Sequence, residues 1–294
     1  MTRIIADSTC DLNPKLLKDY DLTILPLGIT IENETYADGI DIQVNEIYGY
    51  MRRGILPKTS QITYDDVSHT FRKFAEAGED FIYISFSSKM SGCYEFATMI
   101  QKELAPEYPN VKMTVIDSKG GSSATGLIVW QALIQAASGM EYGQIVRDIQ
   151  FMTEHIEHIF SVADLEWLAL GGRISKPLGY LGNKLNLKPW LDVQDGAMHV
   201  RGMVHGRKKA IHLVAEELVK RAAPFPEQMI AINHADDLES ALELEECVKS
   251  MLPECQTTIS HIGGILGVHI GICAIGGYCL NQKPEHYSLP DHLK

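Results

Sequence analysis

Several signatures of common enzyme classes are missing from this 294-residue chain. No G-x-x-x-x-G-K-[ST] motif is present to hold ATP in a P-loop, and no G-x-G-x-x-G follows the first predicted strand to hold a dinucleotide. Metal ligands are poorly spaced: His155 and His158 are placed to share a helix face, but no third ligand accompanies them. The sequence therefore predicts neither a nucleotide cofactor nor a metal site.

Basic residues are scarce relative to acidic ones, with 26 Lys and Arg against 38 Asp and Glu, and the formal net charge is −12. Nucleic acids and anionic lipid surfaces require a basic face, so neither is expected as a main partner. Any anion that binds this protein must be held by a local cluster of donors and cations.

The six cysteines include no C-x-x-C pair, and no secretion signal precedes them. We therefore expect reduced, mostly buried thiols in a cytoplasmic protein. Residues 263–280 lack Asp, Glu, Lys and Arg and approach the length of a membrane span. Six glycines and His269 in this stretch favour tight turns inside a globular core, so no stable membrane insertion is expected.

Predicted strands alternate with predicted helices over residues 1–155. The strands are expected at Arg3–Asp7, Leu22–Ile31, Phe81–Phe86 and Val111–Asp117. The helices are expected at Val44–Arg53, from a capping box at Thr63-x-x-Asp66, from Cys93, at Ala124–Ala137 and at Tyr142–His155, with a polar loop at Pro57–Gln61. This order predicts a doubly wound, Rossmann-like parallel sheet, with ligands beyond the carboxyl ends of its strands.

The pattern changes over residues 156–294, where an α+β domain is predicted. Asp195-Gly196 predicts a β-hairpin between Leu187–Val193 and Met198–Val204. The remaining predicted elements are a strand at Ile159–Ala163, a short helix ended by Gly171-Gly172, a helix at Arg207–Arg221, a strand at Met229–Asn233, a helix at Asp237–Met251 and a strand at Thr257–Ile262. No Pro-rich linker separates the two domains, so we expect them to pack tightly.

The stretch Phe86–Tyr94 predicts a strand, a serine-rich loop and a helix that begins near Ser91. Free N–H groups at the start of that helix are a seat for an anion, although Ser91 is also explained as an ordinary N-cap. Other polar groups suited to a carboxylate or phosphate are Thr59, Ser60, Gly92, Arg173 and His269. Taken singly, each has a simpler explanation as a turn, surface or core residue.

An enzyme is the main alternative. Gly120-Gly121-Ser122-Ser123-Ala124 is similar to a nucleophile elbow, but it lacks the last glycine of G-x-S-x-G. An α/β serine hydrolase acting on an ester or acyl substrate through Ser91 or Ser122 therefore remains open, as does a sensor of a small polar metabolite.

Taken together, these motifs resemble the DegV family, bacterial proteins that bind a long-chain fatty acid. The resemblance covers nearly the whole chain and depends on the order of its motifs. The motifs are Asp7-Ser8-Thr9-Cys10-Asp11-Leu12, Lys58-Thr59-Ser60-Gln61, Ser87-Ser88, Ser91-Gly92, Asp117-Ser118-Lys119, Gly171-Gly172-Arg173-Ile174-Ser175, Leu187-Lys188-Pro189 and the glycine-rich block around His269.

The resemblance implies a fatty acid in the cleft between the two domains, with its tail in a tunnel formed by residues 156–294. It implies that Thr59 and Ser91 hydrogen-bond the carboxylate and that Arg173 and His269 lie close by. It also implies a lipid carrier rather than an enzyme, with no cofactor of its own. The expected partner is an ATP-dependent fatty acid kinase, which converts the presented carboxylate to an acyl phosphate.

Two positions depart from the family's pattern. Ile270-Gly271-Ile272-Cys273 stands where the family usually has Thr-Gly-Pro-Gly, which bears on the pose of His269 and on acyl-chain preference. Val204-His205-Gly206 stands where the family often has Val-Arg-Thr, which bears on docking of the kinase.

Overall fold

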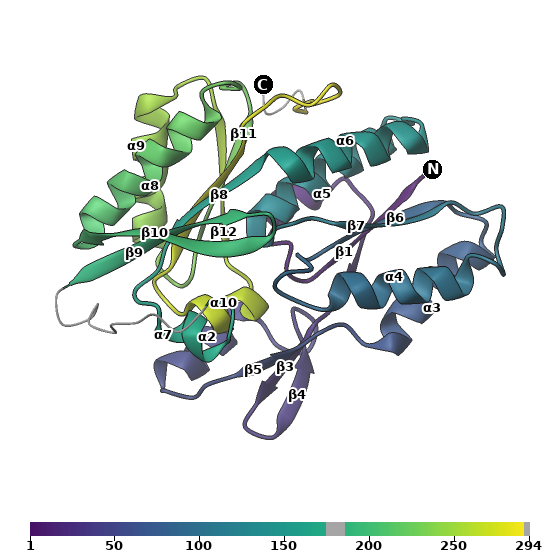
Figure 1. Cartoon of the computed structure of the whole chain (residues 1–294), viewed down its shortest axis with the longest axis horizontal. Helices are drawn as coiled ribbons and strands as arrows, with labels where there is room; N and C mark the ends of the chain where they lie inside the picture. Colours follow the sequence, from purple (N-terminus) through teal and green to yellow (C-terminus); the bar gives the residue numbers. More distant parts are fainter. Residues whose placement is uncertain (175–185, 291–294) are drawn as a thin grey trace.

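The computed structural model describes residues 1–174 and 186–290. A parallel sheet of order β2-β1-β6-β7 organises the first half of the chain (Figure 1). Its strands are β1 (Arg3–Asp7), β2 (Leu22–Leu25), β6 (Phe81–Ser85) and β7 (Met113–Asp117). Because all pairings are parallel, the loops after β1, β6 and β7 leave the same edge of the sheet, as predicted.

Helices cover both faces of this sheet because its strands bury side chains on both sides. Ile5 and Tyr83 face one core, while Ile4 and Ile82 face the other. The first core includes side chains of α3 (Tyr64–Glu76) and α4 (Cys93–Leu104), and the second includes side chains of α5 (Ser122–Ala137) and α6 (Tyr142–His155). The doubly wound arrangement is therefore confirmed.

The predicted strand Leu22–Ile31 is wrong as a single element. Pro26, which has no N–H to donate to a sheet, separates β2 from β3 (Gly28–Ile31). The strand β3 belongs to a separate three-stranded sheet with β4 (Glu34–Ala37) and β5 (Lys58–Ser60). The segment predicted as a polar loop at Pro57–Gln61 thus contains a strand, paired antiparallel with β3.

A six-stranded sheet of order β10-β9-β8-β13-β11-β12 organises the second half. Its strands are β8 (Ile156–Ser161), β9 (Leu187–Gln194), β10 (Ala197–His205), β11 (Met229–His234), β12 (Gln256–His261) and β13 (Ile275–Leu280). The hairpin β9–β10 is confirmed. The helices α8 (Arg207–Ala222) and α9 (Leu238–Met251) pack on this sheet, and α5 contacts both large sheets.

Residues 263–280 lie in the globular core, but the helix and the strand that they form were not predicted. This stretch contains the helix α10 (Gly264–Ile270) and the fully buried strand β13, which lies between β8 and β11. The predicted start of β8 is also corrected, since the strand begins at Ile156, directly after α6. The described residues also include three short helices, α1 (Pro14–Leu17), α2 (Val44–Arg52) and α7 (Glu166–Leu170).

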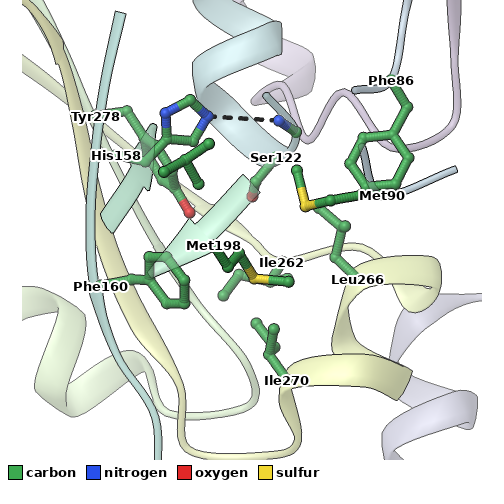
Figure 2. Close-up of a pocket in the computed structure, with 12 residues that line it drawn as sticks. Phe86, Met90, Ser122, His158, Phe160, Met198, Ile262, Leu266, Ile270 and Tyr278 are labelled. Atoms are coloured by element: carbon green, nitrogen blue, oxygen red, sulfur yellow. Dashed lines mark hydrogen bonds between the residues drawn. The ribbon is translucent and has the colours of Figure 1, made fainter. Parts of the chain in front are cut away.

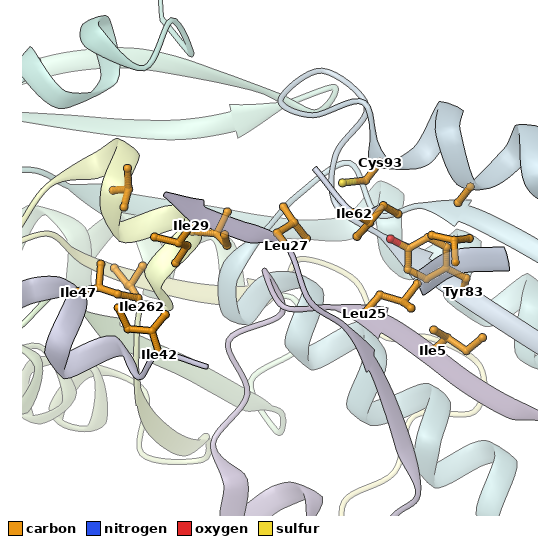
Figure 3. Close-up of a cluster of buried hydrophobic side chains, with 14 of the residues drawn as sticks. Ile5, Leu25, Leu27, Ile29, Ile42, Ile47, Ile62, Tyr83, Cys93 and Ile262 are labelled. Carbon is orange, nitrogen blue, oxygen red and sulfur yellow. The ribbon is translucent and has the colours of Figure 1, made fainter. Parts of the chain in front are cut away.

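One apolar core joins the two halves of the chain. Figure 3 shows it running from Ile5 and Tyr83 of the parallel sheet, through Ile29 of β3, to Ile47 of α2 and Ile262 after β12. The division of the chain at residue 155 stays a prediction. Within the described ranges, no helix is long and apolar enough to cross a membrane.

Candidate functional site

A cavity lies where β5, the start of α4 and α10 meet. Its empty volume is about 650 Å³, including the space at its open mouth. We call it the polar cavity, because its lining includes all six of the predicted ligand-binding residues: Thr59, Ser60, Ser91, Gly92, Arg173 and His269. The structure therefore brings the six residues together, while their binding of a ligand stays a prediction.

Thr59 and His269 meet across the polar cavity although they are far apart in the sequence. Thr59 lies on β5, opposite Ile29 of β3. Its Oγ1 is 2.8 Å from Nε2 of His269, in the last turn of α10. The hydroxyl and the imidazole therefore form one hydrogen-bonded unit in the cavity wall.

The His269 ring is neutral at neutral pH. Burial, with a smaller contribution from the charge of Arg173, lowers its pKa to about 4. Its Nδ1 has no hydrogen-bond partner among the described residues. Gly171 packs against this atom so closely that a Cβ at position 171 would lie 2.3 Å from Nδ1. The glycine therefore makes room for the ring.

Arg173 brings the positive charge to the polar cavity. Its Nη1 donates to the carbonyl oxygen of Gly171 at 2.5 Å and its Nε to that of Met90 at 3.3 Å. Burial lowers its pKa, but a guanidinium stays charged. Within residues 1–174 and 186–290 no ion pair links Arg173 to a carboxylate, and its side chain lines the polar cavity. Ser175, the last residue of this motif, lies outside the described residues.

Ser91 and Gly92 precede α4. The N-cap is Gly92 rather than Ser91, and the Ser91 hydroxyl accepts a hydrogen bond from the N–H of Cys93 at 3.4 Å. The same hydroxyl lies 3.1 Å from the Cys93 sulfur. Ser91 is thus near the positive end of the α4 dipole and also lines the cavity, which suits an anion.

The loop that carries Ser91 is held by buried hydrogen bonds. Asp7 accepts from the N–H of Phe86 at 2.7 Å and from the hydroxyl of Tyr83 at 3.0 Å. Ser87 donates to the carbonyl oxygen of Gly196, in the turn of the β9–β10 hairpin, at 2.7 Å. The motifs around Asp7 and Ser87 therefore position the loop rather than line the polar cavity.

A second cavity adjoins the first, and Figure 2 shows the residues that line it. Its empty volume is about 400 Å³, including open space at its mouth, and since its lining is almost entirely nonpolar we call it the apolar cavity. Five side chains line both cavities: Phe86, Met90, Met198, Leu266 and Ile270. The rest of its wall is Gly121, Ser122, His158, Phe160, Val193, Ile262 and Tyr278. Residues from both halves of the chain form this wall, not residues 156–294 alone.

The two serines considered as nucleophiles lack a histidine base. Ser122 donates to Asp11 Oδ2 at 2.6 Å and accepts from Asn233 at 2.5 Å. The nearby His158 ring instead accepts the N–H of Gly121 at 3.4 Å, as the dashed line in Figure 2 marks. Neither Ser91 nor Ser122 hydrogen-bonds a histidine in the described part of the chain, so the hydrolase alternative is not favoured.

The expected geometry of His155 and His158 is wrong, because His155 ends α6 and His158 lies in β8. The described residues contain no group of three metal-ligating side chains. Sequence reasoning also missed Gln61, which lines the polar cavity. The one signal for it was its place in the Lys58-Thr59-Ser60-Gln61 motif.

The fold and the site define an α/β protein with two large sheets, in which a polar cavity opens into an apolar one. A family model described as an uncharacterised protein of the DegV family matches residues 1–281, and the chain belongs to that family. A DegV domain-containing protein of Clostridium perfringens is 32% identical over 285 residues, covering 96% of this chain and 98% of the relative. One from Lactococcus lactis is 30% identical over 271 residues, covering 89% and 94%.

Solved structures show the same fold. A stearic acid-binding protein of Eubacterium ventriosum has a TM-score of 0.85 at 27% identity, covering 96% of this chain and 99% of that one. A fatty acid-binding DegV protein of Thermus thermophilus has a TM-score of 0.82 at 26% identity, covering 94% and 98%. The fatty acid kinase B3 protein of Streptococcus pneumoniae, loaded with linoleic acid, has a TM-score of 0.85 over 96% and 100%. At 21% identity this last likeness shows the fold alone.

Proposed function

We propose that this protein binds a long-chain fatty acid in the cytoplasm and presents its carboxylate to an ATP-dependent fatty acid kinase. The observation that carries the proposal is the continuity of the polar cavity with the apolar one. Thr59, Ser91 and Arg173 offer hydroxyls and a cation to the carboxylate, beside neutral His269. The nonpolar walls then surround the tail. The stearic acid named for the Eubacterium protein and the fatty acid binding named for the Thermus protein support this assignment.

The tail dominates affinity in this proposal, and the head group sets orientation. Burying a methylene is worth about 0.8 kcal/mol, so a tail of ~15 methylenes contributes roughly 12 kcal/mol before the costs of binding. A hydrogen bond to a charged group contributes about 1.5–3 kcal/mol. Losing one head-group contact therefore leaves the lipid bound but less well oriented.

The kinase part of the proposal has less support. It depends on the name of the Streptococcus protein and on the lack of an ATP-binding motif in this chain. In the proposed reaction a carboxylate oxygen attacks the γ-phosphorus of ATP on the kinase, and ADP leaves. This protein contributes the position of the carboxylate.

Organic extraction of the purified protein, followed by mass spectrometry, tests the lipid assignment. We expect a fatty acid at about one per chain. Delipidated protein should also take up an added fatty acid. A cavity that takes up no fatty acid contradicts the proposal. Turnover of an ester probe would support a hydrolase, and an extracted polar metabolite would support a sensor.

The variant Ser91→Ala tests the division between tail and head group. We expect retained lipid to change by less than about twofold, while acyl-phosphate formation with a fatty acid kinase and ATP falls about tenfold, because one contact that orients the carboxylate is lost. Ser250→Ala, on the exposed side of α9, is the matched control. Equal loss of retention and transfer would contradict the division.

A further inference from the structure

Gln61 also lines the polar cavity, next to the six residues described above. It follows β5 directly, and its carboxamide lies over Gly92, the residue before α4. Its Oε1 is so close that a Cβ built on Gly92 would be 2.5 Å from it. Gln61 therefore places an amide between Thr59 and Ser60 on one side and the start of α4 on the other.

The backbone at position 92 does not itself require glycine. Gly92 has φ −83° and ψ 7°, a conformation open to other residues. The atoms within 4 Å of the Cβ position are Oε1 of Gln61, at 2.5 Å, and its Cδ, at 3.7 Å. Glycine at position 92 therefore leaves room for the Gln61 carboxamide.

The Gln61 carboxamide has no hydrogen-bond partner among the residues that the structure describes. A glutamine amide carries two N–H donors on Nε2, and here they are not used to hold the fold together. The polar cavity is also lined by hydroxyls and by the guanidinium of Arg173, so a further donor fits a site for an anion.

We propose that Gln61 is a head-group ligand, that it donates a hydrogen bond from Nε2 to the carboxylate of the fatty acid, and that Gly92 is needed to seat it there. This inference rests on the proposed function, because the anion is the lipid's carboxylate. It assigns Gly92 a role through Gln61 rather than through its own contact with the lipid.

The test is a double-mutant cycle on delipidated protein. Dissociation constants are measured for a fatty acid and for the fatty alcohol of equal chain length, with Gln61→Ala, Gly92→Ala and the double variant. We expect each single variant to bind the acid roughly three- to tenfold more weakly, because a charge-assisted hydrogen bond at a partly exposed site is lost. The alcohol should change by less than about twofold.

The double variant should bind the acid no more weakly than either single variant, since both substitutions remove the same contact. Additive losses, or equal losses for acid and alcohol, would overturn the proposal. The control is Gly49→Ala in α2, where a Cβ meets nothing within 4 Å, and it should leave acid binding unchanged. A wild-type protein that binds no acid refutes the proposed function, whereas wild-type-like acid binding in all three variants refutes the Gln61 inference alone.

Introducing a negative charge at position 61 gives an independent check. Gln61→Glu keeps the size of the side chain, replaces its donors with acceptors and adds a negative charge facing the carboxylate. We expect acid binding at neutral pH to fall further than in Gln61→Ala, with the thermal unfolding midpoint unchanged because the side chain is exposed. Acid binding equal to that of the wild type would contradict a direct contact between Gln61 and the carboxylate.

Discussion

The surroundings of Asp11 predict how the free energy of unfolding depends on pH. The side chain is buried and accepts hydrogen bonds from the N–H of Gly263 and, at 2.6 Å, from the hydroxyl of Ser122, which lines the apolar cavity. Burial raises its pKa from the ordinary 3.8 to about 8. At neutral pH the folded protein therefore holds a proton on Asp11 that the unfolded chain has released.

The folded-state pKa of Asp11 is the higher one, so its contribution to stability is complete below about pH 4 and is lost as pH rises to about 8. Within this window the free energy of unfolding changes by up to ~1.4 kcal/mol per pH unit. Asn cannot ionise, but its carbonyl can still accept from Ser122. From pH 5 to pH 7, Asp11→Asn should therefore gain about 1–3 kcal/mol relative to the wild type.

Urea unfolding of both proteins at pH 5, 6, 7 and 8 measures this gain. Other buried groups titrate in both proteins, so the difference between the two curves isolates position 11. The difference should grow up to about pH 8 and then level off. Two stability curves that stay parallel from pH 5 to 7 would refute the assignment of a raised pKa to Asp11.

Three further predictions concern the cavities and the turn after α10. Arg173→Gln should weaken fatty acid binding about 5- to 30-fold by calorimetry and leave fatty alcohol binding unchanged, because a partly screened charge contact contributes about 1–2 kcal/mol. Val193 and His158 line both the apolar cavity and a charged cavity of about 920 Å³. Val193→Ala should therefore lengthen the longest acyl chain that the protein retains, as measured by mass spectrometry. Gln194 lines the charged cavity but not the apolar one, so Gln194→Ala should leave that length unchanged. Cys273 has φ +64°, so Cys273→Gly should raise the free energy of unfolding by up to about 1 kcal/mol in thermal melts; a loss would contradict the strain.

The parallel sheet could be predicted because its strands carry their own signals. Phe81–Ser85 is buried along its whole length and mostly apolar, and a polar loop follows it before a helix of regular apolar spacing. The N-cap at Thr63 is likewise local, since the Thr63 hydroxyl accepts from the N–H of Asp66 at 3.2 Å, although the reciprocal bond of a capping box is not seen in the described residues. Signals of this kind depend on neighbours in the sequence and are visible without the fold.

The glycine-rich stretch could not be predicted, because the reason for its glycines lies elsewhere in the chain. A Cβ at Gly264 would meet Ile47 at 2.3 Å, one at Gly267 would meet the Tyr48 hydroxyl at 2.6 Å, and one at Gly277 would meet Leu218 at 2.4 Å. The glycines that suggested turns in the sequence are therefore sites of close packing, and they allow α10 and β13 to pack in the core. The hydrogen bond between Thr59 and His269 spans 210 residues and is equally invisible to sequence spacing.

The departure at Ile270-Gly271-Ile272-Cys273 can now be judged from where its side chains lie. The contacts that hold the His269 ring do not involve these four residues. Its Nε2 lies 2.8 Å from the Thr59 hydroxyl, and Gly171 packs against its Nδ1. Ile270, which stands where the family usually has Thr, lines both cavities at their junction. In the proposed complex, the ethyl group that replaces the threonine hydroxyl would therefore face the first part of the tail rather than the imidazole. The substitution is expected to act on the choice of acyl chain, and the capture of the carboxylate should depend little on it.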